Sequence, residues 1–299
     1  MTAAPRRQRA QLGELREHEP MAGYTTWRVG GPARRLYRPA GAAELADFLA
    51  GLPAREPLLW CGLGSNLLVR DGGFPGTVLL TQGGLDGLAV ADGRVRAEAG
   101  VACGRLARET VRAGLGGLAF LAGIPGTVGG ALALNAGAWG GTTWERLVAV
   151  ETVDRTGRIR HRTPADFEVG YRWVHGPFGE SFLAATWALE PAPVAELREG
   201  VRTLLRRRNA AQPVGQATCG SVFRNPPGDA AGRLIDSAGL KGAQCGCARV
   251  SIRHANFILN EGGSAADIEA LMRHVQRRVA AVHGVHLEPE VHIVGEALP

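Results

Sequence analysis

Three side chains stand in surroundings that could support chemistry. Arg172 lies between Tyr171 and Trp173, where the simplest interpretation is a surface arginine stacked on Trp173. Ser221 follows a glycine and precedes two strand-like residues, but a serine without a histidine base is more often a turn residue than a nucleophile. Glu290 alternates with apolar residues and is expected to point inward, where a carboxylate needs a partner or a raised pKa.

Two glycine-rich stretches could hold a cofactor. One runs from Gly123 to Ala131 and continues from Asn135 to Gly141, and the other is Gly62-Leu63-Gly64-Ser65-Asn66. Glycine is needed where the backbone takes positive φ or where another group approaches it closely, and N–H groups in such turns form nests for electron-rich ligands. We interpret the longer stretch as a cofactor cradle, with a glycine-rich corner of a sheet protein as the alternative. The shorter loop alone is weak evidence for nucleotide binding, and it does not fit a Rossmann fingerprint because no long helix and no acidic residue follow at the expected spacing.

Composition indicates an ordinary globular protein with unusually many glycines. The 299 residues suffice for two compact domains, or for one large and one small domain. The 43 glycines are about double the usual ~7% share, which points to turns and ligand loops. The net charge of +6 permits a nucleic-acid partner, but the one basic cluster, Arg206-Arg207-Arg208, has no interleaved aromatic residues. We therefore expect an anionic small molecule as partner and no nucleic acid.

Cysteine usage and hydropathy indicate a cytoplasmic protein without a metal site or a membrane partner. Five cysteines without a disulfide framework suggest a reducing compartment. Cys245-Gly246-Cys247 lacks a second pair at zinc spacing, so no metal is expected. The N-terminal arginines are not followed by a secretory signal. The span from Ala113 to Trp144 is uncharged, but its glycines and Pro125 argue against a membrane helix.

The elements that must position these residues follow an α+β pattern over the first two thirds of the chain. Residues 1–20 resemble a loose arm or a short helix, and residues 24–33 resemble a strand that ends in a Gly-Gly-Pro turn. Helical spacing predicts helices over 44–49 and 103–113. Strands are expected at 58–61, 67–69, 77–80 and 182–189, with hairpins over 88–98 and 147–160.

Pro191-Ala192-Pro193 marks a boundary, after which helices dominate. One helix begins near Val194 and runs into the arginine cluster with its apolar residues on one face. Another begins at a capping box, Ser264 to Asp267, and ends at Gly284. Short strands are expected at 285–287 and 291–294.

Seven motifs follow one another along the chain. They are the Gly62 to Leu68 loop, the Gly123 to Ala131 loop with Asn135-Ala136-Gly137-Ala138, Tyr171-Arg172, Cys219-Gly220-Ser221-Val222-Phe223, Ala231-Gly232-Arg233-Leu234-Ile235-Asp236, His254-Ala255-Asn256-Phe257 and Glu290. In this order they resemble the UDP-N-acetylenolpyruvoylglucosamine reductase family, from about Thr25 to Glu296. The short distance from Arg172 to Ser221 resembles the subclass that lacks an extra substrate-capping tyrosine loop.

The resemblance implies the architecture in more detail. It predicts an α+β protein with a two-subdomain FAD-binding fold of the vanillyl-alcohol-oxidase type and a C-terminal α/β substrate domain. By this correspondence, residues 1–84 form the first FAD-binding subdomain and residues 85–192 the second. Residues 193–299 form the substrate-binding domain.

The resemblance also implies an NADPH-dependent flavoenzyme of peptidoglycan precursor synthesis, and hence of cell-wall growth and cell division. NADPH reduces noncovalently bound FAD and leaves. The enolpyruvyl ether of UDP-N-acetylglucosamine then takes hydride from flavin N5 and a proton at the neighbouring carbon, which gives UDP-N-acetylmuramate. Ser221 corresponds to the proton donor, while Arg172 and Glu290 assist the enolate-like intermediate. A monomer is expected.

The remaining site residues follow from the same correspondence. Substrate contacts are expected from Tyr171, Arg224 and Asn225. FAD contacts are expected from Gly62, Leu63, Gly64, Ser65, Asn66, Leu67, Gly123, Pro125, Gly126, Thr127, Gly129, Gly130, Asn135 and Gly137.

Three positions depart from the family pattern. Ala211 stands where a lysine usually reaches the substrate's phosphates. His292 replaces an arginine, which would make activity pH-sensitive near neutrality, and Trp139 replaces a tyrosine. The candidate substitutes for the lysine are Arg207, Arg208 and Arg224.

Two other functions are compatible with the sequence. A flavin oxidase of the same cofactor fold, acting on a sugar or an alcohol, would react with oxygen and often carry covalent flavin. A nucleotide-sugar-binding relative without turnover would account for Ala211 and His292. Anaerobic mixing of the reduced protein with the enolpyruvyl sugar nucleotide separates the three, because only the reductase is reoxidised by it.

Overall fold

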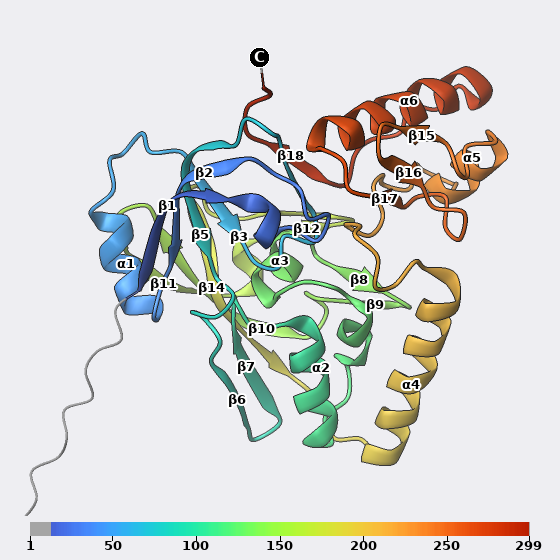
Figure 1. Ribbon diagram of the computed structural model, residues 1–299. Coiled ribbons are helices and arrows are strands. Elements are labelled where there is room, and N and C mark those ends of the chain that lie inside the picture. Colours follow the sequence, from blue (N-terminus) through green and yellow to red (C-terminus); the bar gives the residue numbers. More distant parts are fainter. Residues whose placement is uncertain (1–12, 299) are drawn as a thin grey trace, which may run out of the picture.

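The computed structural model describes residues 13–298, and its N-terminal part is a four-stranded sheet (Figure 1). The strand order is β1-β2-β5-β3, in which β1 is antiparallel to β2 and the other neighbours are parallel. Helix α1 (Ala42–Ala50) connects β2 to β3 and buries Leu45 and Leu49. The strands are β1 (Glu14–Pro20), β2 (Pro32–Arg38), β3 (Leu58–Cys61) and β5 (Phe74–Leu80).

The middle of the chain builds a five-stranded antiparallel sheet in the order β11-β10-β14-β7-β6. The pairs β6–β7 and β10–β11 are the two hairpins expected from the sequence, so these predictions are confirmed. Helices α2 (Cys103–Arg112) and α3 (Val128–Ala133) contribute apolar side chains to the core beside this sheet. The strands are β6 (Leu88–Ala91), β7 (Arg94–Glu98), β10 (Leu147–Asp154), β11 (Ile159–Arg162) and β14 (Glu180–Ala188).

Two small ribbons complete the middle part. In one, β12 (Glu168–Gly170) pairs with β13 (Trp173–His175), so residues 171 and 172 form the turn between them. In the other, β8 (Gly137–Ala138) pairs with β9 (Gly141–Thr142) inside the second glycine-rich stretch.

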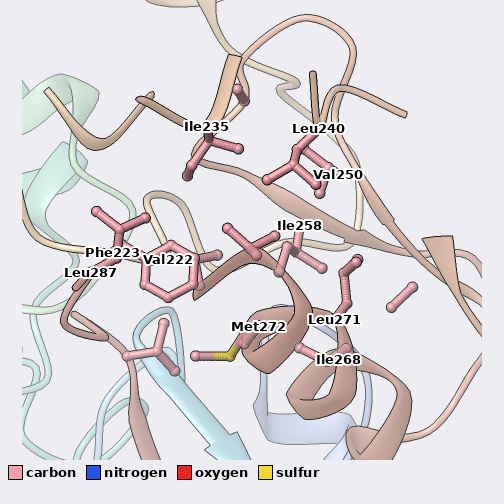
Figure 2. Close-up of a cluster of buried hydrophobic side chains, with 14 of the residues drawn as sticks. Val222, Phe223, Ile235, Leu240, Val250, Ile258, Ile268, Leu271, Met272 and Leu287 are labelled. Atoms are coloured by element: carbon pink, nitrogen blue, oxygen red, sulfur yellow. The ribbon is translucent and has the colours of Figure 1, made fainter. Parts of the chain in front are cut away.

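The C-terminal part packs around α6 (Ala265–His283). Figure 2 shows Ile268, Leu271 and Met272 of this helix among apolar side chains from residues 222–258 before the helix and from Leu287 after it. Ser264 and Asp267 form the predicted capping box, and Gly284 ends the helix at a left-handed φ of 68°, so both predictions are confirmed. The other elements are α4 (Val194–Ala211), α5 (Ala231–Ser237) and the sheet of β15 (Gln244–Cys245), β16 (Ala248–Val250) and β17 (Ile258–Asn260).

The N-terminal and C-terminal parts interlock. Trp27 is fully buried in the C-terminal core, where its Nε1 donates a 2.9 Å hydrogen bond to the carbonyl of Ile258. The Asn260 amide in turn donates to the carbonyl of Trp27 at 2.9 Å. Near the end of the chain, β18 (His292–Val294) returns to pair in parallel with β4 (Leu67–Val69). The domain boundaries after residues 84 and 192 stay predictions.

Two local predictions near the N-terminus are wrong. Residues 14–20 form β1 rather than an arm or a short helix, because they find a partner in β2; residues 1–12 lie outside the described part. The strand expected over residues 24–33 begins only at Pro32. Before it, Arg28 takes a left-handed φ of 59° and Trp27 is drawn into the C-terminal core, which breaks the extended path.

One C-terminal prediction is also wrong. Residues 285–287 do not form a strand, and the carbonyl of Leu287 accepts a 2.9 Å hydrogen bond from the Gln276 amide instead of pairing in a sheet. The strand expected over 291–294 is present as β18. Over residues 13–298, the helices lack the combination of length and apolar character that a membrane crossing requires.

Replacing Trp27 by phenylalanine is expected to lower the free energy of unfolding by about 2–3 kcal/mol. The substitution leaves the buried carbonyl of Ile258 without its donor and opens space in the core. Urea unfolding followed by circular dichroism measures the change. Trp173→Phe, at a more exposed position, is the control and should cost less than about 0.5 kcal/mol. Equal effects of the two substitutions would contradict the anchoring role of Trp27.

Candidate active site

A cleft of about 600 Å³ lies where three parts of the chain meet. The glycine-rich stretches provide part of its wall, the segment between Arg208 and Ser221 provides another part, and Glu290 and His292 complete it. The predicted site residues that line this cleft are Gly62, Leu63, Gly64, Ser65, Asn66, Leu67, Gly123, Pro125, Gly126, Thr127, Gly130, Gly137, Arg172, Ser221 and Glu290.

The two glycine-rich stretches are tied into one surface. Ser65 Oγ donates a 2.6 Å hydrogen bond to the carbonyl of Pro125. Gly64 has a φ of 62°, and a Cβ at this position would overlap the carbonyl of Tyr24. A Cβ at Gly62 would overlap the hydroxyl of Thr127. Close packing of Gly62 against the Thr127 side chain and of Gly64 against the Tyr24 backbone therefore explains part of the glycine content of the first stretch.

Two features of this surface fit a bound flavin nucleotide. Thr127 Oγ1 is buried, yet it has no hydrogen-bond partner within residues 13–298. At Gly130 an added Cβ would meet no described atom within 4 Å, and this residue lines the cleft. A hydroxyl without a partner and an uncrowded glycine on a cleft wall suit a ligand that approaches the backbone closely.

Two of the predicted FAD-contacting residues do not line the cleft. Gly129 packs against Ala99, whose Cβ would lie 3.0 Å from a Cβ at Gly129. The Asn135 side chain donates to the carbonyl of Gly170 at 3.2 Å and accepts from the backbone N–H of Trp144 at 3.3 Å. These residues shape the surroundings of the cleft, and their contacts with FAD stay predictions.

Arg172 occupies the two-residue turn between β12 and β13, with a left-handed φ of 63°. Its Nη1 donates a 3.4 Å hydrogen bond to the carbonyl of Gly137. Its Nε lies 2.9 Å from Glu290 Oε1 in an ion pair. The guanidinium is thus held between a glycine-rich stretch and the C-terminal segment.

Glu290 is a largely buried acid that faces two arginines. Burial raises the pKa of its carboxyl group, and the positive charges of Arg172 and Arg224 oppose that rise. The Glu290 N–H donates to the carbonyl of Val222 at 2.8 Å, and the Asn66 side chain donates to the carbonyl of Glu290 at 2.9 Å. Asn66 therefore connects the first glycine-rich stretch directly to the predicted acid.

The backbone next to Ser221 is held by Asn256. The N–H of Val222 donates to the carbonyl of Asn256 at 2.9 Å. The Asn256 side chain, on a residue only 3% exposed, accepts from the N–H of Phe223 at 3.0 Å and donates to its carbonyl at 2.8 Å. Sequence reasoning included Asn256 as part of a motif, but its bracing role depends on long-range contacts.

Helix α4 brings further residues to the cleft. Arg208 lines it, and its Nε donates a 3.3 Å hydrogen bond to Gln212 Oε1, while Arg207 faces a neighbouring groove. The residues from Gln212 to Gln216 also line the cleft, although sequence reasoning did not assign them to the site. The sequence feature that could have drawn attention to them is Pro213, which follows the end of α4 and marks the start of a loop.

The three predicted substrate-binding residues do not line the cleft. Tyr171 is 55% exposed, and its ring centroid lies 5.3 Å from the guanidinium carbon of Arg172. The Asn225 side chain accepts a 3.0 Å hydrogen bond from the N–H of Ala231 at the start of α5. Arg224 acts on Glu290 through its charge. Their contacts with substrate stay predictions.

His292 lies two positions after Glu290 and lines the same cleft. Burial lowers the pKa of its imidazole, and the positive charge of Arg224 lowers it further. The pH sensitivity near neutrality that the sequence led us to expect from His292 stays a prediction. Within residues 13–298, no three histidine, cysteine, aspartate or glutamate side chains gather in a way that could hold a metal ion.

Comparisons with known proteins identify the family. Residues 33–163 match a model of FAD-binding domains, and residues 212–294 match the C-terminal domain of UDP-N-acetylenolpyruvoylglucosamine reductase. The reductase of Alkalilimnicola ehrlichii is 64% identical over 298 residues, 99% of each chain. That of Methylococcus capsulatus is 55% identical over 301 residues, covering 99% of this chain and 96% of the relative.

A solved structure agrees with these sequence matches. The crystal structure of the Thermus caldophilus reductase has a TM-score of 0.80 and 36% identity, covering 94% of this chain and 98% of that one. This chain belongs to the UDP-N-acetylenolpyruvoylglucosamine reductase family. The predicted fold class, FAD cofactor, hydride donor NADPH and reductase activity of peptidoglycan precursor synthesis are thereby confirmed for this reductase. Neither a flavin oxidase nor a noncatalytic relative is favoured.

Replacing Gly130 by alanine is expected to weaken FAD binding at least about tenfold without harming the fold. The added methyl group meets no protein atom, so it would raise helix stability by about 0.5–1 kcal/mol while taking space at the cofactor surface. The dissociation constant of FAD, measured by adding it back to the apoprotein, and thermal unfolding of the apoprotein give the two readouts.

Gly104→Ala in α2 is the matched control. Its Cβ is equally uncrowded, but Gly104 does not line the cleft. The control should gain similar stability and keep the FAD affinity of the unmodified protein. Unchanged FAD affinity in Gly130→Ala would remove Gly130 from the proposed cofactor surface.

Proposed function

We propose that Arg172, Ser221 and Glu290 carry out the substrate half of the reductase reaction. The observation that supports this best is that three residues distant in sequence face one cleft, together with the residues expected to hold FAD. An acid such as Glu290, whose pKa is shifted by burial and by neighbouring charges and which lines a cleft, is typical of active sites. The glycine-rich stretches, with Thr127 Oγ1 as a free hydrogen-bonding group, are proposed to bind FAD noncovalently.

Arg172 is proposed to stabilise the negative charge that develops on the substrate. FAD, once reduced, supplies the hydride that reaches the terminal carbon of the enolpyruvyl group. Negative charge then grows beside the substrate's carboxylate, where a guanidinium is well suited to hold it. Gly137 and Glu290 fix the Arg172 side chain in advance, so little reorganisation is needed during the reaction.

Ser221 is proposed to donate its hydroxyl proton to the carbon next to that carboxylate. A hydroxyl group is a weak acid, so it can serve only against a strongly basic carbon. Glu290 holds a proton more readily than an ordinary glutamate because burial raises its pKa, and it is proposed to restore the serine's proton. One hydride and one proton are thus added across the double bond, which gives UDP-N-acetylmuramate.

We also propose that the reductase acts as a monomer in the cytoplasm. The groups of the proposed site come from one chain, and the five cysteines are free, as is usual in a reducing compartment. Size-exclusion chromatography coupled to light scattering tests the oligomeric state, since the mass measured for a monomer is that of one chain.

Ser221→Ala is expected to separate the two half-reactions. Flavin reduction by NADPH should stay within about twofold of the unmodified rate, because it does not use the serine. Reoxidation of the reduced flavin by the enolpyruvyl nucleotide should fall by about 10²–10⁴-fold, since the proton donor is lost. Anaerobic stopped-flow absorbance measures both steps, with Ser237→Ala on an exposed position of α5 as control. If both half-reactions survive, Ser221 is only a turn residue.

Arg224→Gln is expected to shift the pH dependence of the substrate half-reaction to higher pH. The Arg224 charge lowers the pKa of Glu290, so its removal lets that pKa rise. If protonated Glu290 restores the serine's proton, reoxidation slows as pH rises through this pKa, and the slowing should begin at higher pH in the variant. Rates from pH 5 to 9 test this, with Arg249→Gln, at an ion pair with Glu261, as control. A shift toward lower pH would contradict the role of Glu290.

A further inference from the structure

The positive charge of the protein is concentrated on two neighbouring helices. The whole chain has a net charge of +6. Helix α4 has five arginines and two glutamates, and α2, which lies beside it, has three arginines and one glutamate (Figure 1). These two helices therefore account for most of the net charge, and the rest of the chain is close to neutral. Such an uneven distribution indicates a surface for an anionic partner.

Three arginines form a line along the exposed side of α4. Arg198, Arg202 and Arg206 are spaced four residues apart, which places them one above another on the helix surface. Within residues 13–298, Glu199 is the only acid that pairs with this line, and it is shared between Arg202 and Arg206. Among the described residues, none of the three arginines lines the cleft, so the proposed function does not account for them.

Half-buried apolar residues border this line. Val201 follows Arg198 by three positions and Leu205 follows Arg202 by three, so each lies next to an arginine on the helix surface. Although α4 is 18 residues long, the described chain fully buries none of its residues. Apolar side chains that are partly exposed beside arginines are typical of a helix at the boundary between water and a lipid bilayer.

Helix α2 adds positive charge next to α4. Arg105, Arg108 and Arg112 are all exposed, and their spacing places them on the side of the helix opposite its buried residues. Glu109 is the one acid of this helix, and both Arg108 and Arg112 pair with it. Charges on the two helices add to one positive field.

We propose that α4, together with α2, forms a basic face by which the reductase binds reversibly to an anionic phospholipid bilayer. The lipid phosphates would attract the arginines, while Val201 and Leu205 would enter the boundary between headgroups and acyl chains. A second copy of the chain does not fit this face, because a symmetric contact would set arginines against arginines. Nucleic acid also fits less well, since its phosphates offer nothing to the apolar neighbours.

This proposal extends the expectation drawn from the sequence. The absence of a membrane partner was expected from hydropathy and from the glycines and the proline of one uncharged span, which are criteria for a segment that crosses a bilayer. A charged helix that lies on the surface of a bilayer is not detected by those criteria. The sequence nevertheless contains its signal, which is the repeat of arginine every four residues along a predicted helix.

Vesicle sedimentation tests the proposal with the FAD-loaded reductase. Vesicles of phosphatidylglycerol and phosphatidylcholine in equal parts should sediment the protein at low ionic strength, whereas vesicles of phosphatidylcholine alone should not. Binding should disappear as the salt concentration rises to ~0.5 M, because salt screens exposed charges. The triple variant Arg198→Gln, Arg202→Gln, Arg206→Gln should lower the partition coefficient about 100-fold, since each arginine near an anionic surface contributes about fivefold.

A matched variant separates a local effect from an effect of net charge. The triple variant Arg273→Gln, Arg277→Gln, Arg278→Gln removes three exposed charges from α6, which lies apart from α4 (Figure 1). Its partition coefficient should stay within about threefold of the unmodified value, because charges far from the bound surface are screened. Equal losses in the α4 and α6 variants would overturn the proposal, and so would equal binding to neutral and anionic vesicles.

Two further measurements complete the test. A titration with duplex DNA at the same ionic strength separates lipid from nucleic acid, and binding of DNA without sedimentation by the anionic vesicles would overturn the proposal. Circular dichroism and reductase activity should show that the α4 variant is folded. If it unfolds, substituting Arg105, Arg108 and Arg112 by glutamine decides the question: sedimentation should weaken at least about tenfold, and unchanged sedimentation would reject the basic face. Sedimentation is measured without turnover, so its failure leaves the proposed function intact.

Discussion

Main-chain hydrogen bonds along residues 288–294 hold the proposed active site together. On one side, the N–H of Arg224 donates to the carbonyl of Glu288 and the N–H of Glu290 donates to Val222, which joins this segment to the one that carries Ser221. On the other side, His292 donates to the carbonyl of Asn66 and β18 pairs with β4. Each bond contributes only about 1 kcal/mol to stability, but leaving one unmade at a buried position costs more. The distances among the cofactor surface, Glu290 and Ser221 are therefore fixed by the fold.

These main-chain hydrogen bonds also determine where the charged side chains of the cleft lie. A partly buried ion pair such as Arg172–Glu290 gains little net stability, because desolvation offsets most of the attraction. Its value lies in orientation, since each side chain holds the other in one place. Arg208 lacks such an acidic partner within the described chain, and its Nε donates to the neutral side chain of Gln212.

Local features of the fold could be predicted from the sequence, whereas features that depend on distant contacts could not. The hairpin β6–β7 follows from alternation and a tight turn, and α6 follows from its capping box and its final glycine. Residues 24–33 do not form the expected strand, because Trp27 turns into the C-terminal core and donates a hydrogen bond to the carbonyl of Ile258, 231 positions away. No local pattern contains that contact.

The candidate site likewise has features that the sequence indicated and features that depend on distant contacts. The ordered motifs indicated the family and drew attention to Arg172, Ser221 and Glu290, all of which line one cleft. They could not indicate that Asn256 braces the backbone beside Ser221, or that Arg208 is without an acidic partner. Both facts depend on which segments meet in space, and spacing along the chain does not contain that information.

The pairing of β18 with β4 also has a consequence for synthesis of the protein. In the described sheets, β4 has β18 as its only strand partner, and the Asn66–Glu290 contact joins residues 224 positions apart. Contacts between such remote segments close late in folding because of the entropy lost on closing the loop. While the chain leaves the ribosome, β4 stays an open edge that other strands could join. The residues proposed for flavin binding all precede Glu290 in the chain, but Asn66 gains its bonds to Glu290 and His292 only when the C-terminal segment has arrived, so the cofactor surface and the substrate site are completed together.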